Sequence, residues 1–194
     1  GIFWVVAIAL TVSWIVAVKY CQWLNEREKI PEREWCYDNV WGEKDTNPVP
    51  KPDHLKLKGY RLPTEAEWAF ACSSGSEDLW HYGNNETHSK YYEWNEPHAA
   101  NKTREVATLR PNSFGLFDMS GNLAEWTDSS FQQPLRPLFQ SFVEDSREPT
   151  SERTMFYVMA GGRFKQSALS SVTSASTANA PEYSSITTGF RLAR

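Results

Sequence analysis

The sequence lacks several features that would assign it to a familiar class of protein. Its 20 Lys and Arg residues stand against 24 Asp and Glu residues without a basic stripe, which argues against nucleic acid as a partner. Its 10 Gly and 11 Pro residues are too few for a low-complexity chain of 194 residues. It contains no internal repeat, which argues against a repeat architecture.

Cysteine is also scarce. Cys21, Cys36 and Cys72 form no CxxC motif and no Cys/His pair at metal-ligand spacing, so the common zinc-binding patterns are excluded. Two alternatives stay open: three buried thiols, or one disulfide and one remaining thiol.

Aromatic residues, in contrast, are abundant, with 9 Trp, 8 Tyr and 10 Phe. Large rigid rings bury much area each and suit a compact but irregular fold. The length is that of one domain, or of one domain with an appendage.

The N-terminal run GIFWVVAIALTVSWIVAVKY has no charged residue before Lys19 and has two interpretations. Residues 2–18 lie at the lower length limit of a membrane span. We favour an apolar strand within residues 1–10 that pairs with the terminal strand at 189–194, followed by a helix capped by Ser13. In this interpretation Trp14 and Trp23 are buried.

The clearest local signal is GYRLPTEAEWAFACSSG, in which Thr64 and Glu67 form a capping box at the start of a helix. Residues 76–110 are irregular, and residues 132–154 form a polar loop with three prolines. The stretches MFYVMAGGRF and TGFRLAR are predicted strands. The pattern predicts an α+β fold with few helices, short antiparallel strands and long ordered loops.

Five stretches carry a family resemblance: VSW…AVKYCQWLN, GYRLPTEAEWAFAC, PNSFGLFDMSGNLAEW, AGGRF and GFRLAR, in this order. From residue 11 to residue 194 they resemble the formylglycine-generating enzyme (sulfatase-modifying factor) family, above all a bacterial branch common in planctomycetes. The resemblance implies a loop-rich C-type-lectin-like fold whose core includes Trp68, Phe114, Phe117, Trp126 and Phe190. Family members carry several dozen residues before the first helix, where this chain has only residues 1–10.

The family enzymes oxidise a sulfatase cysteine to formylglycine with two cysteines that bind copper, and these lie between the GG strand and the final GFR. Here that interval, residues 163–188, contains no cysteine, and Gln166 and Ser171 stand near the thiol positions. A hydroxyl does not replace a thiolate as a Cu(I) ligand. The sequence therefore predicts a domain without copper and without this catalytic activity.

The same interval is dominated by small residues, since 15 of the 22 residues at 167–188 are Ser, Thr or Ala. Some proteins of this branch with a C-type lectin fold are variable proteins of diversity-generating retroelements, and their variable region lies here. A surface-exposed connection of small residues without a binding role is the alternative that stays open. The resemblance thus implies an exposed binding face at 163–188, with a protein as the expected ligand. The expected contact residues are Lys165, Gln166, Ser170, Thr173, Ser176 and Tyr183.

A structural calcium ion is a second implication of the resemblance, because the family segment matching DMSGNLAE wraps one. Asp118 and Glu125 would supply carboxylates, and Gly121 and Leu123 backbone carbonyls, a mixture of oxygen ligands that Ca²⁺ accepts. The alternative is that Asp118 and Glu125 only accept hydrogen bonds from loop amides.

Other functions stay open at this stage, namely a copper-dependent formylglycine-generating oxidase and a regulatory or scaffold domain. The resemblance implies a bacterial protein, located either at the cell surface or in the cytoplasm. It would contact a membrane only if residues 2–18 cross the bilayer.

Overall fold

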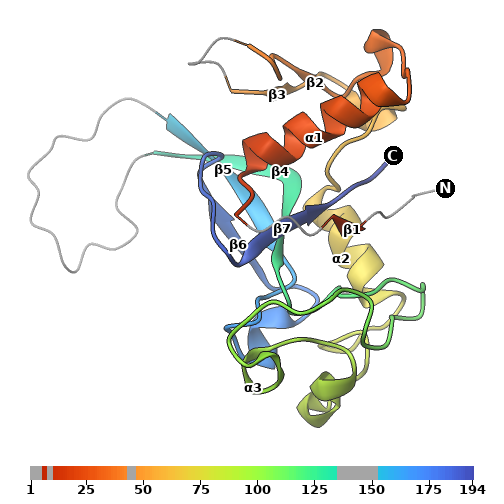
Figure 1. Ribbon diagram of the computed structural model, residues 1–194, viewed down its shortest axis with the longest axis vertical. Helices are drawn as coiled ribbons and strands as arrows, with labels where there is room; N and C mark the ends of the chain where they lie inside the picture. The colour runs from red at the N-terminus through yellow and green to blue at the C-terminus, as the bar shows by residue number, and fades with distance from the viewer. Residues whose placement is uncertain (1–5, 8–10, 43–46, 135–152) are drawn as a thin grey trace, which may run out of the picture.

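The computed structural model describes residues 6–7, 11–42, 47–134 and 153–194 of the chain. A five-stranded sheet forms its centre, in the order β1–β7–β4–β5–β6 (Figure 1). Its strands are β1 (Val6–Ala7), β4 (Ala124–Pro134), β5 (Arg153–Ala160), β6 (Ser176–Asn179) and β7 (Thr188–Arg191). The pair β4–β7 is parallel and the other pairs are antiparallel. A short hairpin of β2 (Tyr37–Asp38) and β3 (Val49–Pro50) lies apart from this sheet.

Three α-helices occur in the described residues, α1 (Trp14–Arg27), α2 (Glu65–Ser73) and α3 (Glu96–Ala99). Their starts follow from local chemistry. The Ser13 hydroxyl accepts the Val16 amide at 3.3 Å, and Thr64 and Glu67 form the predicted capping box. Ser74 ends α2 in a left-handed conformation.

The two longer helices cover opposite faces of the sheet, because neighbouring strand residues point to opposite sides. Trp126 and Phe190 lie in one apolar cluster with the buried face of α1. The residue before Trp126, Glu125, accepts a hydrogen bond from the indole of Trp68 in α2 at 2.7 Å. The sheet is therefore the middle layer between α1 and α2.

The core on the α1 side is aromatic, and hydrogen bonds from the indole groups fix its rings. The ring of Trp14 stacks on Tyr157 of β5 at 3.7 Å, and its Nε1 donates to the Thr127 carbonyl at 3.1 Å. The Trp126 indole donates to the Val12 carbonyl at 2.9 Å. Below the sheet in Figure 1, residues 76–123 form an irregular layer with 3₁₀ turns and α3, as the turn signals predicted.

The N-terminal strand is confirmed for its described part, since Val6 pairs with Arg191 and Ala7 with Phe190. Thr11 has a positive φ and α1 begins at Trp14, so these residues do not continue one helix over 2–18. No helix in the described residues is long and apolar enough to cross a membrane. The rest of the predicted strand, at 3–5 and 8–10, lies outside the described residues.

The α+β class with few helices is confirmed, but several local predictions are wrong. Trp23 is 40% exposed because it lies beside the buried stripe of α1, and Phe114 is 49% exposed on a turn, where it packs on the exposed Phe70. Phe117 is only half-buried. The supposed loop at 132–154 begins and ends as strand, because β4 and β5 pair from Pro134 opposite Arg153 inward.

These differences in burial predict different costs of truncation. Trp126→Ala should lower the free energy of unfolding by about 3–5 kcal/mol, because the residue is fully buried and the lost volume leaves a cavity. Trp23→Ala is the matched control and should cost about 1 kcal/mol or less, since the side chain is partly solvated. Urea denaturation of both variants measures the difference, and equal losses would contradict this description of the core.

Candidate functional site

The segment from Gly161 to Thr188 leaves the sheet after β5 and returns to it at β7. The Gly121 amide donates to the Gly161 carbonyl at 2.6 Å, and the Ala124 amide donates to the Thr187 carbonyl at 3.0 Å. Both ends of the segment are thus held by the short stretch that leads into β4.

Two glycines make the exit from β5 possible. Both have positive φ values, 98° for Gly161 and 69° for Gly162. A Cβ at Gly161 would lie 2.9 Å from the ring of Trp68, and one at Gly162 would lie 2.7 Å from the Cβ of Ser171. The close approach at Gly162 holds the 3₁₀ turn Ala168–Ser171 against the end of the strand.

Most side chains of residues 165–188 are exposed or half-buried, as predicted. The buried exceptions in this range are Ala168, Ser171, Pro181, Thr187 and Thr188. The segment is therefore a surface with a few fixed points, and its role as a binding face stays a prediction.

A pocket of about 220 Å³ opens on this surface, where β5 ends and β6 begins. Its floor contains Ala124 and Met159, which belong to the sheet and are buried. The remaining lining residues come from the segment itself: Gly162, Arg163, Gln166, Ser170, Ala175, Ser176 and Thr177.

The structure gathers three of the six predicted contact residues in this pocket, namely Gln166, Ser170 and Ser176. Lys165 is exposed next to them, with its Nζ 5.6 Å from the centre of the Phe164 ring. Thr173 does not line the pocket. Its backbone amide and its hydroxyl both donate to the Leu79 carbonyl, at 3.0 and 3.3 Å.

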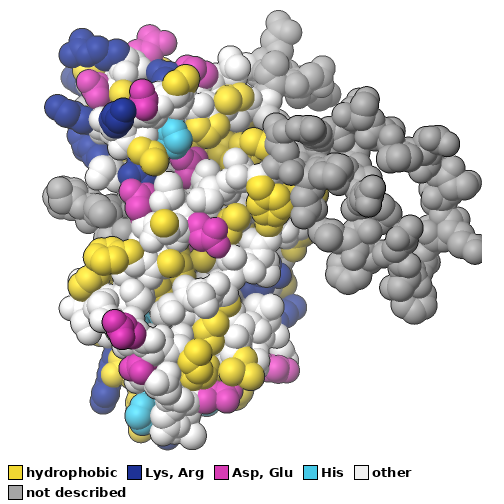
Figure 2. Space-filling model, turned by 180° about the vertical axis from the view of Figure 1, so that it is seen from behind, with side chains coloured by type: hydrophobic (Ala, Val, Ile, Leu, Met, Phe, Trp, Pro, Cys, Tyr) yellow, Lys and Arg dark blue, Asp and Glu magenta, His cyan; other side chains and the backbone are white. Residues whose placement is uncertain are grey.

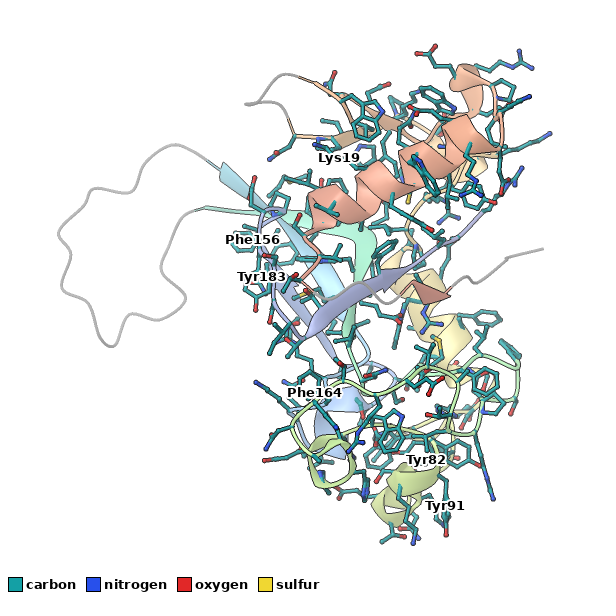
Figure 3. The ribbon with its side chains drawn as sticks, viewed as in Figure 1. Lys19, Tyr82, Tyr91, Phe156, Phe164 and Tyr183 are labelled. Atoms are coloured by element: carbon teal, nitrogen blue, oxygen red, sulfur yellow. The ribbon has the colours of Figure 1, made fainter. Side chains whose placement is uncertain are left out.

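Tyr183 also lies outside the pocket. Its ring is half-buried and meets Trp126 edge-on at 6.5 Å, so it packs onto the α1 side of the core. Figure 3 shows it beside the sheet near Phe156, well above Phe164.

Sequence reasoning missed Arg163 as a lining residue. The signal was available, since Arg163 directly follows the two glycines and is one of two cations in an interval whose only acidic residue is Glu182.

A buried carboxyl group lies under the segment. The Tyr82 hydroxyl and the Asn95 amide donate to Oε1 of Glu93 at 2.8 and 3.3 Å. The Ser171 hydroxyl contacts Oε2 of Glu93 and also lies 2.8 Å from the Ala168 carbonyl. Because a hydroxyl has one hydrogen, both contacts are satisfied when Glu93 is protonated and donates to Ser171. Burial accordingly raises the pKa of Glu93 to about 7.

The three cysteines are free, buried and separate from the pocket. Cys21 and Cys36 belong to the core cluster on the α1 side, and Cys72 belongs to the cluster around Trp68. Burial raises the pKa of Cys36 to about 11 and that of Cys72 to about 12, which disfavours the thiolate that metals bind.

The residues predicted to bind calcium lie close together, but Glu125 is already paired. Arg191 bonds to both carboxylate oxygens of Glu125, and its Nη2 also donates to the Asp118 carbonyl at 3.3 Å. One carboxylate oxygen of Asp118 accepts the Ala107 amide at 2.8 Å. In this arrangement the predicted ligands do not form an open oxygen cage, because a guanidinium supplies the positive charge.

No group of three or more His, Cys, Asp and Glu side chains in the described residues is placed to hold a metal ion. The calcium site therefore stays a prediction, and it requires Glu125 to exchange Arg191 for the ion.

Basic side chains on the face shown in Figure 2 gather mainly at one end of the molecule and form no continuous stripe, which agrees with the composition.

Known proteins similar to this chain point to one family. The family profile described as the sulfatase-modifying factor enzyme 1-like domain matches residues 9–194. The solved structure of Treponema denticola variable protein 1 matches with a TM-score of 0.72 and 27% identity, covering 95% of this chain and 70% of that one.

Two characterised relatives are longer than this chain. The chaperone protein LppX of Paenibacillus barcinonensis is 29% identical over 153 residues, which are 65% of this chain and 53% of LppX. The formylglycine-generating enzyme of Mus musculus is 28% identical over 130 residues, which are 61% of this chain and 26% of the enzyme. The matched region thus spans about half of the first relative and about a quarter of the second.

The raised pKa of Glu93 predicts a stability that depends on pH. Between the unfolded value of 4.5 and the folded value of about 7, the folded state binds a proton that the unfolded state has released. The contribution of Glu93 to stability should therefore fall as pH rises through this window, by about 3 kcal/mol in total. Glu93→Gln keeps a donor for Ser171 and an acceptor for Tyr82 without the charge, so its stability relative to the wild type should rise between about pH 5 and pH 8. The contribution of His81, whose pKa burial lowers to about 4, is common to both proteins.

Denaturant titrations at several pH values measure this dependence. Glu96→Gln is the control, because Glu96 is exposed and its replacement should preserve the wild-type profile. A Glu93→Gln profile that follows the wild type would assign the dependence to another group.

The calcium prediction is tested by removing metal. Calcium added to chelator-treated protein should raise the melting temperature with concentration, since an ion that binds only the folded state stabilises it. Asp118→Asn, which leaves the pair of Glu125 and Arg191 intact, should weaken the shift, and magnesium serves as the control ion. An unchanged melting curve would leave Arg191 as the only cation at this position.

Proposed function

Because the chain belongs to the sulfatase-modifying factor enzyme 1-like domain family, as its motifs predicted, we propose that it is a non-catalytic ligand-binding domain of that family. Its ligand is a protein, bound at the pocket and the surrounding surface of residues 163–188. The observation that carries this proposal is the pocket itself, which is lined by amide, hydroxyl and guanidinium groups and by no thiol.

The absence of thiols from this interval argues against the oxidase alternative. Copper-dependent oxidation requires thiolate ligands, and residues 163–188 contain no cysteine. Ser171, at one of the expected thiol positions, is buried and occupied by its contacts with Glu93 and Ala168. The cysteines of the chain are buried elsewhere, with raised pKa values for their thiols.

The construction of the segment favours a protein partner. Its exposed residues are mainly small, so they can be exchanged at little cost in stability, whereas the sheet and α2 beneath them are closely packed. This division suits a protein whose binding face varies. The likeness to a Treponema denticola protein named as a variable protein supports the further proposal that a diversity-generating retroelement varies this segment. A relative named as a chaperone protein also favours a protein rather than a metabolite as the partner.

The proposal predicts that binding depends on the pocket. Peptides selected from a random display library on the full chain should lose at least tenfold in affinity when Ser170→Leu and Ser176→Leu fill the pocket, while the melting temperature stays unchanged. Ser113→Leu and Ser130→Leu form the matched control, since these serines are exposed but lie outside residues 163–188 and do not line the pocket. Calorimetry or interferometry measures both affinities.

Two results would contradict the proposal. One is a selection that yields only binders insensitive to the pocket variants. The other is conversion of a cysteine-containing sulfatase peptide to its aldehyde by the full chain under air with added copper, since that reaction would restore the oxidase alternative.

A further inference from the structure

Arg163 is held in a fixed position at the edge of the pocket. Its carbonyl accepts the Gln166 amide at 3.0 Å, which closes a turn over residues 163–166. The next residue, Phe164, donates its amide to the Asn122 carbonyl at 3.0 Å and is buried. The backbone on both sides is thus anchored, and the half-buried Arg163 side chain lines the pocket.

The guanidinium of Arg163 has unused hydrogen-bonding capacity. Its Nη2 lies 3.4 Å from the Thr177 hydroxyl, a long contact, and a guanidinium carries five N–H donors. Arg61, Arg191 and Arg194 each form an ion pair with a glutamate. In contrast, no carboxylate among the described residues lies within ion-pair distance of Arg163.

The charges around the pocket leave this cation uncompensated. Lys165 adds a second positive charge nearby. Glu182 is the only acidic residue in the interval, and its carboxylate accepts a hydrogen bond from Asn47 at 2.9 Å instead. Glu96 approaches through its backbone, because its amide donates to the Gln166 carbonyl at 2.9 Å, but its side chain is exposed and does not line the pocket.

The size of the pocket restricts what it can hold. A volume of about 220 Å³ is smaller than the sites of about 300–1,000 Å³ that hold drug-sized ligands. The pocket floor, formed by Ala124 and Met159, is apolar. The wall includes the side-chain amide of Gln166 and the hydroxyls of Ser170 and Ser176. Such a pocket suits one side chain with an apolar stem and an acceptor at its tip.

We propose that this pocket receives the carboxylate side chain of a glutamate or aspartate on the partner protein, with Arg163 as its principal binding group. A carboxylate can take two parallel hydrogen bonds from a guanidinium and further bonds from hydroxyls, which makes such contacts strong and geometrically selective. The inference rests on the proposed binding function and adds the chemistry of the anchor residue.

An isolated side-chain probe tests the pocket without a partner. N-acetyl-L-glutamate N-methylamide, titrated into the ¹⁵N-labelled full chain, should shift the Arg163 Nε–Hε signal and the Ser170 and Ser176 amide signals saturably. The neutral glutamine derivative is the matched probe and should leave these signals in place. Arg163→Gln should weaken binding of the glutamate probe at least tenfold.

Two further variants separate charge from geometry. Arg163→Lys keeps the charge but loses the planar fork, so it should bind the probe more weakly than the wild type and more strongly than Arg163→Gln. Arg33→Gln removes an exposed cation that does not line the pocket and should leave the affinity unchanged. Melting curves confirm that each variant is folded. If Arg163→Gln does not fold, the affinity of Arg163→Lys for the probe is the test.

The inference is overturned if the glutamine derivative binds as tightly as the glutamate probe, or if Arg163→Gln retains full affinity for the glutamate probe. It is also overturned if inorganic phosphate shifts the same signals as strongly, because the pocket would then be a general anion site. Its failure is distinct from failure of the proposed function. Selected peptides that depend on Ser170 and Ser176 but contain no acidic anchor would uphold protein binding and reject the carboxylate. Saturable binding of the probe, together with selected peptides whose affinity does not depend on Ser170 and Ser176, would uphold the carboxylate site and reject the proposed protein-binding function.

Discussion

A buried ion pair between Glu125 and Arg191 ties two strands of the sheet to α2 and to the loop before β4. Both side chains lie on the α2 side of the sheet, where they join β4 to β7, and Trp68 of α2 donates to the same carboxylate. Arg191 also bonds to the carbonyls of Phe117 and Asp118 and so fixes the loop before β4. A buried charge without its partner costs several kcal/mol, so separating Arg191 from Glu125 is unfavourable. The pair therefore fixes the two strands, the loop before β4 and α2 relative to one another.

The surface of residues 163–188, which we propose as a binding face, is held in position by this arrangement. The pocket floor belongs to the sheet, and Gly162 presses the 3₁₀ turn of the segment against the end of β5. Arg163 is positioned by backbone hydrogen bonds to Gln166 and Asn122. The side chains that face solvent can therefore change while the backbone that presents them stays fixed, which is the property that a varied binding face needs.

Sequence patterns predicted the parts of this structure that depend on near neighbours. The caps at Ser13 and Thr64, and the burial of Trp14, Trp68 and Trp126, follow from spacing and motif. Contacts between distant residues were not predictable in this way. The partner of Glu125 is 66 positions away, and the packing of Tyr183 on Trp126 places an apparently available aromatic ring outside the pocket. The pocket likewise exists only because β6 pairs with β5, which no local pattern of small residues indicates.

The anchoring of both ends of the segment on one short stretch has a consequence for its length. Gly161 is held by Gly121 and Thr187 by Ala124, so the ends stay at a fixed separation whatever lies between them. The entropy of closing such a loop grows only with the logarithm of its length, by about 0.6 kcal/mol for each doubling. Insertions at exposed positions of the segment would therefore cost the domain little stability, except where Tyr183 packs on Trp126 and where the Pro181 and Ser185 carbonyls accept backbone amides of residues 15 and 11. The same frame can therefore present loops of different lengths.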